Sequence, residues 1–495
     1  LEIDLKQAEW IGPRDLKPPT QAALLAKNLR SEIESYDVEK LLQIAGNDDP
    51  FLARSALVAL SRDAKHWEVD AVRHWSLDDR VQAVMALDLA NADPDKWLPL
   101  FLGDDSPDVR YQALRWIANS DLKKYLSEVE KILNHSGINY TLFEAAMATW
   151  NTLNNKPEAG IRDVDVLLQR VQDKNSSPRL RAYALRLMPV QSRAAKGADK
   201  LPAKKFPNGL SIELLRELNA VDDTELSLEV IRTAAGNPEV AQELLLESAN
   251  NQDLSVKLRT EAIAGLSAVA TFHIETLLQL ANDEQQSVRE EAMRSLRSSP
   301  LSNKQKDVLR ELAQSHPETD DLVTAVLNPE ILKSDRPAAN DTDAWLQLLE
   351  QASGSADIEN GRRIFHHARV GTCSHCHRHT GRGNTVGPDL TFLSKRATRE
   401  SLLQSILEPS REMAPEFQPR TLLLKDGRVF TGIRLRSYTR EQIRDAHGQT
   451  RTFDKGNVES IKDSNISFMP ADLVNTLTNR EVRDLLAFLM HNSGQ

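Results

Sequence analysis

Residues 371–390 read GTCSHCHRHTGRGNTVGPDL and contain Cys373 and Cys376, the only two cysteines of the 495-residue chain. Two residues separate the cysteines, and His377 follows the second one directly. This spacing is compatible with three kinds of chemistry: a redox-active dithiol, a zinc site, or covalent attachment of a haem. The choice between them decides the fold that is expected around this stretch.

The surroundings of the cysteines argue against a dithiol and against zinc. A redox-active CxxC lies at the start of a helix that follows a strand, where the helix dipole lowers the thiol pKa, but no strand-like sequence precedes Gly371. A structural zinc ion takes four ligands, usually from two separate pairs, and a site built from this one short segment would be crowded. Four nearby histidines are expected at the surface or beside a cofactor edge: His366, His367, His375 and His379.

Haem attachment accounts for both cysteines and for the histidine. Two cysteines at this spacing match the two vinyl groups of one porphyrin edge, where they bind as thioethers. His377 then lies under the iron as the proximal ligand. Because both thiols are used, none remains free for oxidation. The motif therefore predicts one covalent haem c, held by Cys373, Cys376 and His377.

A second pattern recurs from about residue 37 to residue 328. An aliphatic residue is followed four positions later by alanine, then directly by an aliphatic residue, and three positions later by another. This spacing places the side chains on one face of a helix. Copies start at Leu52, Val109, Leu180, Leu258 and Val288, with a looser copy at Val81. The second position of four copies is an arginine, expected to be solvated or to contact the next repeat: Arg110, Arg181, Arg259 and Arg289.

The spacing of the copies predicts an α-solenoid. The last two copies start 30 residues apart, which leaves room for two helices in each unit. Units of this size cannot bury their apolar faces alone and stack on their neighbours. The pattern resembles the short bacterial form of HEAT repeats.

Three segments fall outside the repeats. Residues 1–36 are expected to form an N-terminal arm, and the start at Leu1 rather than at a methionine suggests a processed or excised fragment. Residues 189–209 are rich in Pro, Gly and Lys and predict a long exposed loop. Residues 329–343 predict a linker into the next domain.

The C-terminal domain, residues 344–495, is expected to be helical with a small β-insert. Helix-like segments lie near its two ends. Between them, residues 420–463 alternate between apolar and polar residues and contain an Asp-Gly turn at 426–427. The chain as a whole is therefore expected to be mainly α, with one antiparallel insert.

This domain resembles class I cytochrome c. Gly361 and Phe365 match the N-terminal helix at the point where it crosses the C-terminal helix. The matching face of the C-terminal helix is Leu485, Leu486, Phe488 and Leu489. The resemblance implies that the carbonyl of Pro388 accepts a hydrogen bond from the ring of His377 and so fixes its orientation.

The resemblance also implies a methionine thioether as the distal ligand. Met469 precedes a proline ahead of the last helices, where cytochromes c place their ligand loop. It lies 92 residues after His377, and removal of the 44-residue insert leaves a separation of 48. Met413 is the alternative, with core packing as its simpler role. Met490 falls among core positions of the terminal helix.

The order of the motifs resembles the planctomycete-type haem-binding CxxCH domain. GRRIF, CSHCH, VGPDL, LLLKDGRVFTGI and SFMPADL follow one another between residues 345 and 491. In that family a β-insert separates the haem motif from the Met-Pro ligand, and HEAT-like repeats often lie upstream. Members often also carry a β-propeller like that of quinoprotein sugar dehydrogenases, which this chain lacks.

The charge distribution argues against nucleic acid as the main partner. From Asp343 onward the chain has 21 Lys+Arg and 18 Asp+Glu, a net of +3. Of the totals of 62 and 72, this leaves 41 and 54 upstream, a net of −13. No apolar run approaches the ~20 residues of a membrane helix.

The resemblance implies an electron-transfer cytochrome in the periplasm or another extracytoplasmic compartment, with the repeats as a docking scaffold for a redox partner protein. No catalytic residue is expected, because a fully ligated iron has no open site. Two alternatives stay open. The chain could be the electron-accepting part of a periplasmic sugar or alcohol dehydrogenase, or a solenoid scaffold whose haem senses redox state or a ligand.

Overall fold

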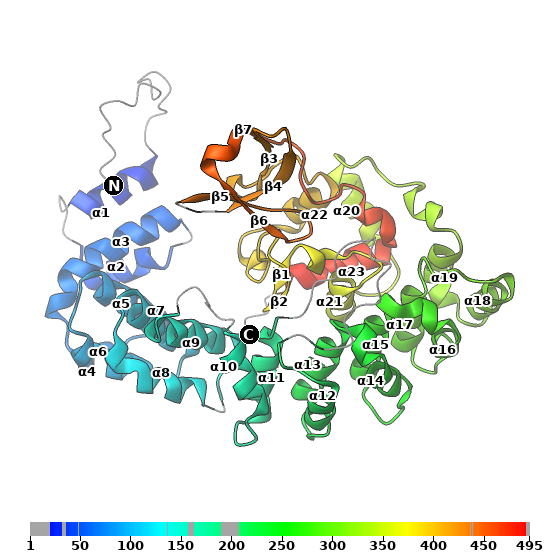
Figure 1. Ribbon diagram of the computed structural model, residues 1–495. Helices are drawn as coiled ribbons and strands as arrows, with labels where there is room; N and C mark the ends of the chain where they lie inside the picture. The colour runs from blue at the N-terminus through cyan, green and yellow to red at the C-terminus, as the bar shows by residue number, and fades with distance from the viewer. Residues whose placement is uncertain are drawn as a thin grey trace. The chain divides into compact units, whose positions relative to one another are not determined.

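The computed structural model describes residues 20–31, 36–47, 49–135, 137–156, 163–189, 206, 208–435, 437 and 439–491. The chain is mainly helical, with a small antiparallel sheet near the C-terminus (Figure 1). It divides into two compact units, Leu1–Asp163 and Val164–Gln495. In the described part of the chain, no helix has the length and apolarity needed to cross a membrane. Most of the expected loop at 189–209 lies outside the described residues.

The described part of the first unit is built of short helices. The helices are α1 (Gln21–Ser31), α2 (Val38–Ala45), α3 (Pro50–Asp63), α4 (Val69–Arg73), α5 (Leu77–Leu89), α6 (Pro94–Leu102), α7 (Pro107–Asn119), α8 (Leu126–Leu133) and α9 (Tyr140–Leu153). The odd-numbered helices α1 to α9 pack side by side in chain order. Asp49 and Ser106 cap α3 and α7 and are each followed by a proline, a combination that favours helix initiation. Residues 21–31, within the expected arm, are helical and pack on α3.

The second unit begins with helices of the same kind. They are α10 (Val164–Gln172), α11 (Pro178–Leu187), α12 (Ile212–Asn219), α13 (Thr224–Ala235), α14 (Pro238–Asn250), α15 (Val256–Leu266), α16 (Ile274–Leu280), α17 (Gln286–Ser295), α18 (Asn303–Ser315) and α19 (Asp320–Leu327). Helices α11, α13, α15, α17 and α19 again lie side by side. The alanines of the repeat pattern, such as Ala262 and Ala292, are fully buried and let the helices approach closely.

The arginines of the repeat pattern connect neighbouring helices in this unit. Arg181 donates from Nε to the carbonyl of Val171 at the end of α10, at 2.9 Å. Arg259 donates in the same way to Ala249 near the end of α14, at 3.0 Å, and also binds Asp283. The last carbonyls of a helix have no partner within the helix, so each arginine satisfies one of them. Of the two expected roles, the contact with the next copy of the pattern is found for Arg259, through Asp283, whereas the bond of Arg181 is to the helix that precedes its own.

Four helices form the core of the C-terminal segment: α20 (Thr342–Glu350), α21 (Ile358–His366), α22 (Arg399–Leu407) and α23 (Asn479–Met490). Helix α21 crosses α23 at Gly361, where a β-carbon would overlap the carbonyl oxygen of Asp484. The ring of Phe365 packs against that of Phe488, with centroids 5.6 Å apart. These are the contacts expected for the two terminal helices. Arg336, in the expected linker, donates to backbone carbonyls just before α23.

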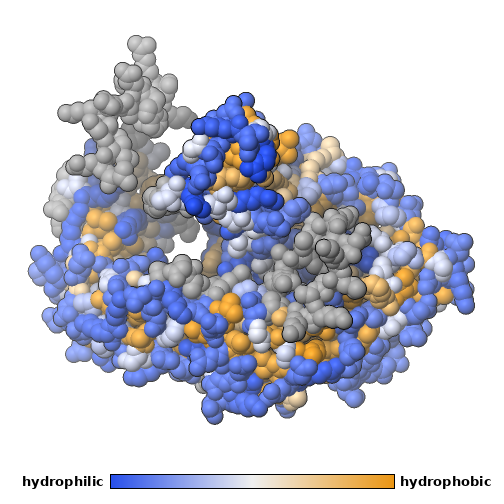
Figure 2. All heavy atoms as spheres, in the orientation of Figure 1, coloured by the Kyte–Doolittle hydropathy of each residue, from blue (hydrophilic) through white to orange (hydrophobic). Residues whose placement is uncertain are grey.

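The expected small antiparallel sheet is confirmed. It consists of β3 (Pro419–Leu424), β4 (Val429–Leu435), β5 (Arg440–Arg444), β6 (Thr450–Asp454) and β7 (Val458–Asp463), in the order β6-β5-β4-β3-β7. The turn between β3 and β4 is the predicted one, with Gly427 at a φ of 85°, which glycine adopts without strain. Hydrophilic residues cover most of the face of the insert that Figure 2 presents.

Candidate cofactor-binding site

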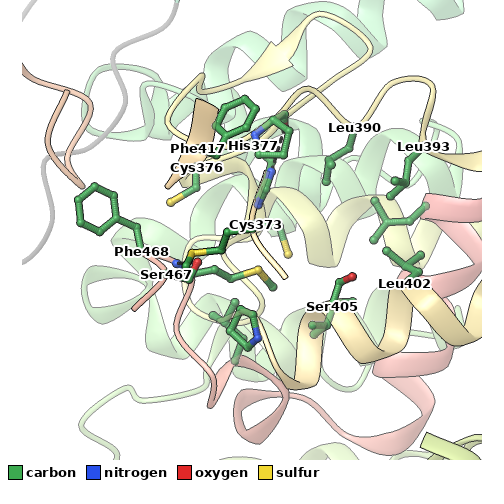
Figure 3. Close-up of a pocket in the computed structure, with 18 of the residues that line it drawn as sticks. Cys373, Cys376, His377, Leu390, Leu393, Leu402, Ser405, Phe417, Ser467 and Phe468 are labelled. Carbon is green, nitrogen blue, oxygen red and sulfur yellow. Dashed lines mark hydrogen bonds between the residues drawn. The ribbon is translucent and has the colours of Figure 1, made fainter. Parts of the chain in front are cut away.

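A cavity of about 300 Å³ lies in the C-terminal segment, beside the CxxCH turn. The turn contributes Cys373, Cys376 and His377, and α22 contributes Leu402 and Ser405 (Figure 3). Other parts of the wall come from the segment before β3, from residues 467–469 and from α23. Most of the lining is aliphatic or aromatic. A cavity of this kind accepts a large apolar group that is fixed by a few polar or sulfur contacts.

The ring of His377 is held in one orientation. Its Nδ1 lies 2.9 Å from the carbonyl oxygen of Pro388, and because a carbonyl only accepts, Nδ1 carries the proton. Nε2 is then unprotonated and can bind a metal. Burial lowers the pKa of His377, although the bond to Pro388 opposes this effect. Gly387 packs on the ring, since a β-carbon there would lie 2.6 Å from Cε1.

Two left-handed residues precede the cysteines, Cys373 begins the single 3-10 turn η8 (Cys373–His375), and Cys376 follows it. The left-handed residues are Gly371 and Thr372, with φ values of 65° and 53°. The two sulfurs are not bonded to each other. Burial raises the pKa of Cys373 to about 12 and also raises the pKa of Cys376. A redox-active dithiol requires the opposite shift, so the surroundings favour the thioether alternative.

Two methionines reach the same cavity. Met469 and Met413 both line it. Their loops are joined, because the amide of Ser467 donates to the hydroxyl of Ser410 at 3.0 Å. Met490 instead packs on the helical core and lines a separate recess. The structure therefore brings together Cys373, Cys376, His377, Pro388, Met413 and Met469.

The expectation for the four nearby histidines was wrong for two of them. His367 and His379 are buried, each with 1% of its surface exposed. His379 packs against Phe488, with ring centroids 4.5 Å apart. His367 faces the carboxylate of Glu291 on α17 at 3.8 Å. Elements far away in the sequence cover both rings. His375 is exposed, and none of the four lines the cavity.

A row of buried glutamates holds the site against the helical repeats. The row consists of Glu229 on α13, Glu261 on α15 and Glu291 on α17. Each binds an arginine of the C-terminal segment: Arg382, Arg362 and Arg363, respectively. Sequence reasoning missed these contacts. A signal existed, since each glutamate stands three residues after a buried aliphatic residue near the start of its helix, at Leu226, Leu258 and Val288.

Both flanks of the CxxCH turn are bonded to residues on or beside helices α13, α15 and α17. Before the turn, Arg369 donates to the carbonyls of Ser267 and Arg297, at 2.5 and 2.9 Å. After it, Arg382 binds the carboxylate of Glu229 at 2.6 Å. Arg382 lies in the short strand β2 (Arg382–Gly383), which pairs with β1 (Arg378–His379) directly after His377. The bond to α13 therefore fixes the segment that carries His377.

The described residues around the CxxCH turn do not form a set of zinc ligands. In the described ranges, no group of three or more His, Cys, Asp or Glu side chains is arranged to hold a metal ion.

No protein-family model matches the chain, and no curated protein is significantly similar to it in sequence. The functional argument therefore rests on the residues and their geometry.

Proposed function

We propose that this protein is a mono-haem c-type cytochrome that transfers electrons. The observation that carries the proposal is the donor set of one apolar cavity. Two thiols at CxxC spacing, an imidazole with Nε2 free and a methionine thioether all lie around it. This set fits a covalently attached haem and does not fit zinc or a dithiol.

The arrangement of the helices supports a cytochrome c-like domain. Helices α21 and α23 cross at Gly361 with their backbones in contact, as expected from the resemblance. The sheet β3–β7 interrupts the domain between the CxxCH turn and Met469. This order supports the planctomycete-type haem-binding domain, and the stacking of α11 to α19 supports HEAT-like repeats before it.

Each residue of the site has a distinct role in this proposal. Cys373 and Cys376 hold the group covalently, and His377 is the proximal ligand, oriented by Pro388. Met469 is the distal ligand, with Met413 as the alternative on the same wall. When bound, the haem supplies a one-electron redox centre. The apolar lining excludes water from that centre.

The proposed location is extracytoplasmic, because c-type haem attachment takes place outside the cytoplasm. The proposed partner is a redox protein, with the repeats as the scaffold that holds the haem domain. The buried Glu229, Glu261 and Glu291 support this scaffold role, since each connects one repeat helix to the haem domain.

The test is a reversible redox titration of the protein made in a host that attaches haem c. We expect the spectrum of a six-coordinate c-type haem that cycles between two oxidation states and binds carbon monoxide poorly. Substitution of both cysteines (Cys373→Ala with Cys376→Ala) should abolish covalent attachment. Ready binding of carbon monoxide would favour a ligand sensor instead, and a colourless wild-type protein would contradict the proposal.

A further inference from the structure

A second recess lies on the opposite side of the CxxCH turn, between the repeats and the C-terminal segment. Its volume is about 150 Å³, and it shares no lining residue with the first cavity. Ser374 and His375, the two residues between the cysteines, face this recess, whereas the cysteines and His377 face the other cavity. Nothing in the proposed electron transfer uses it.

Arginines dominate the polar lining of the recess, and each of them is ion-paired with a glutamate (Glu229, Glu261 or Glu291). Four arginines line it: Arg232 from α13, Arg362 and Arg363 from α21, and Arg382 from β2. The only carboxylate among the lining residues is Glu261. We propose that this recess binds a small tetrahedral oxyanion, such as phosphate or sulfate, between the repeats and the haem-attachment turn.

The hydrogen bonding of the arginines supports this site. Arg232 and Arg362 each bond Glu261 through a terminal guanidinium nitrogen. The buried Nε atoms of both form no hydrogen bond with the residues that the structure describes, and the Nε of Arg362 lies 3.9 Å from Oε2 of Glu359. A buried guanidinium donor without an acceptor is costly. An oxyanion offers several acceptor oxygens to guanidinium groups that approach from different directions.

The electrostatic surroundings of His366 also support an anion site. This side chain also lines the recess. Burial lowers its pKa well below the usual value, and the guanidinium groups of Arg362, Arg382 and Arg232 lower it further. The guanidinium groups therefore act on His366 as positive charges, and an anion in the recess would oppose their effect.

Binding would connect the two parts of the unit. Arg232 belongs to the repeats, and Arg362 and Arg382 belong to the C-terminal segment. An anion that contacts both sides stabilises their docked arrangement, and with it the segment that carries His377. Because a ligand that binds only the folded state raises its stability, the anion should also raise the unfolding temperature.

The test is isothermal titration of the full chain with sodium sulfate and with sodium phosphate, in chloride buffer at constant ionic strength. Ala268 lines the recess from the repeat side, remote from the haem ligands, so Ala268→Glu adds a negative charge there and Ala268→Gln adds the same bulk without charge. Ala220→Glu, at an exposed position outside the recess, is the control for net charge.

We expect saturable binding of one oxyanion per chain and a higher unfolding temperature in sulfate than in chloride. Ala268→Glu should weaken the affinity at least tenfold relative to Ala268→Gln, and Ala220→Glu should leave it unchanged. Equal affinity in the Ala268→Glu and Ala220→Glu variants, or no binding beyond that of chloride, would overturn the site. Tighter binding of succinate than of sulfate would overturn the oxyanion class. Since no readout depends on haem, failure here leaves the proposed function untouched.

Discussion

Replacement of Glu481 by glutamine should destabilise the docked C-terminal segment in a pH-dependent way. The carboxylate is fully buried and accepts hydrogen bonds from Arg294 at 2.6 Å and from the backbone amide of Thr478 at 2.8 Å. A third contact is the ion pair with Arg297 at 2.9 Å. Burial alone would raise the pKa of Glu481, but Arg297 and Arg294 outweigh it and lower the pKa from 4.5 to about 2.

The magnitude follows from that shift. A carboxylate with a lowered pKa contributes its full stabilisation above the unfolded-state pKa and loses it as the pH falls toward the folded-state value. A shift from 4.5 to about 2 corresponds to about 3 kcal/mol at pH 7 and about 1 kcal/mol at pH 3. Glutamine cannot carry this charge. The Glu481→Gln variant should therefore lose about 3 kcal/mol at pH 7, and the loss should shrink to about 1 kcal/mol at pH 3.

The assay is hydrogen exchange by mass spectrometry on peptides that cover α17 and α23, corrected for the intrinsic exchange rate at each pH. It reports the opening free energy of this region alone. The exposed Glu459→Gln is the matched control and should change neither value. An equal loss at both pH values, or a loss below about 1 kcal/mol at pH 7, would refute the role assigned to the charge.

Two further substitutions test the helix crossing and the distal ligand. Gly361→Ala should destabilise the C-terminal segment by about 1–3 kcal/mol or more, because the new β-carbon would overlap the carbonyl of Asp484 and force α21 away from α23; wild-type exchange rates in α23 would contradict this contact. Met469→Ala should abolish the long-wavelength charge-transfer band of a Met-ligated ferric haem, whereas Met413→Ala should keep it. The reverse result would assign the ligand to Met413.

Local signals in the sequence were sufficient for the insert and for the apolar faces of several helices. Alternation and the Asp-Gly turn placed the insert at 420–463, against observed strands from Pro419 to Asp463. The spacing of the repeat pattern placed the apolar faces of helices such as α15 and α17. The contact between His377 and Pro388 was expected from the resemblance to class I cytochrome c, which the CxxCH and GPDL segments carry. Each of these features depends on residues that are close together in the chain.

The contacts between the repeats and the C-terminal segment could not be predicted in this way. In the sequence, Arg362 and Arg363 have the pattern of residues on the exposed face of a helix. Only the packing of α15 and α17 against α21 shows that they bind Glu261 and Glu291. The burial of His367 has the same cause, since α17 covers it. The partners lie 72 to 153 residues apart. At such separations one sequence offers many possible pairs of opposite charge, and no local signal selects the pairs that form.

The most direct test of the account is the intact mass of the denatured protein, produced with active c-type haem maturation. A covalently held haem survives denaturation, so the chain should be heavier than its sequence mass by one haem. Cys373→Ala with Cys376→Ala should return the mass to that of the bare chain. A wild-type chain at its bare sequence mass, from a host that loads other c-type cytochromes, would contradict the central claim.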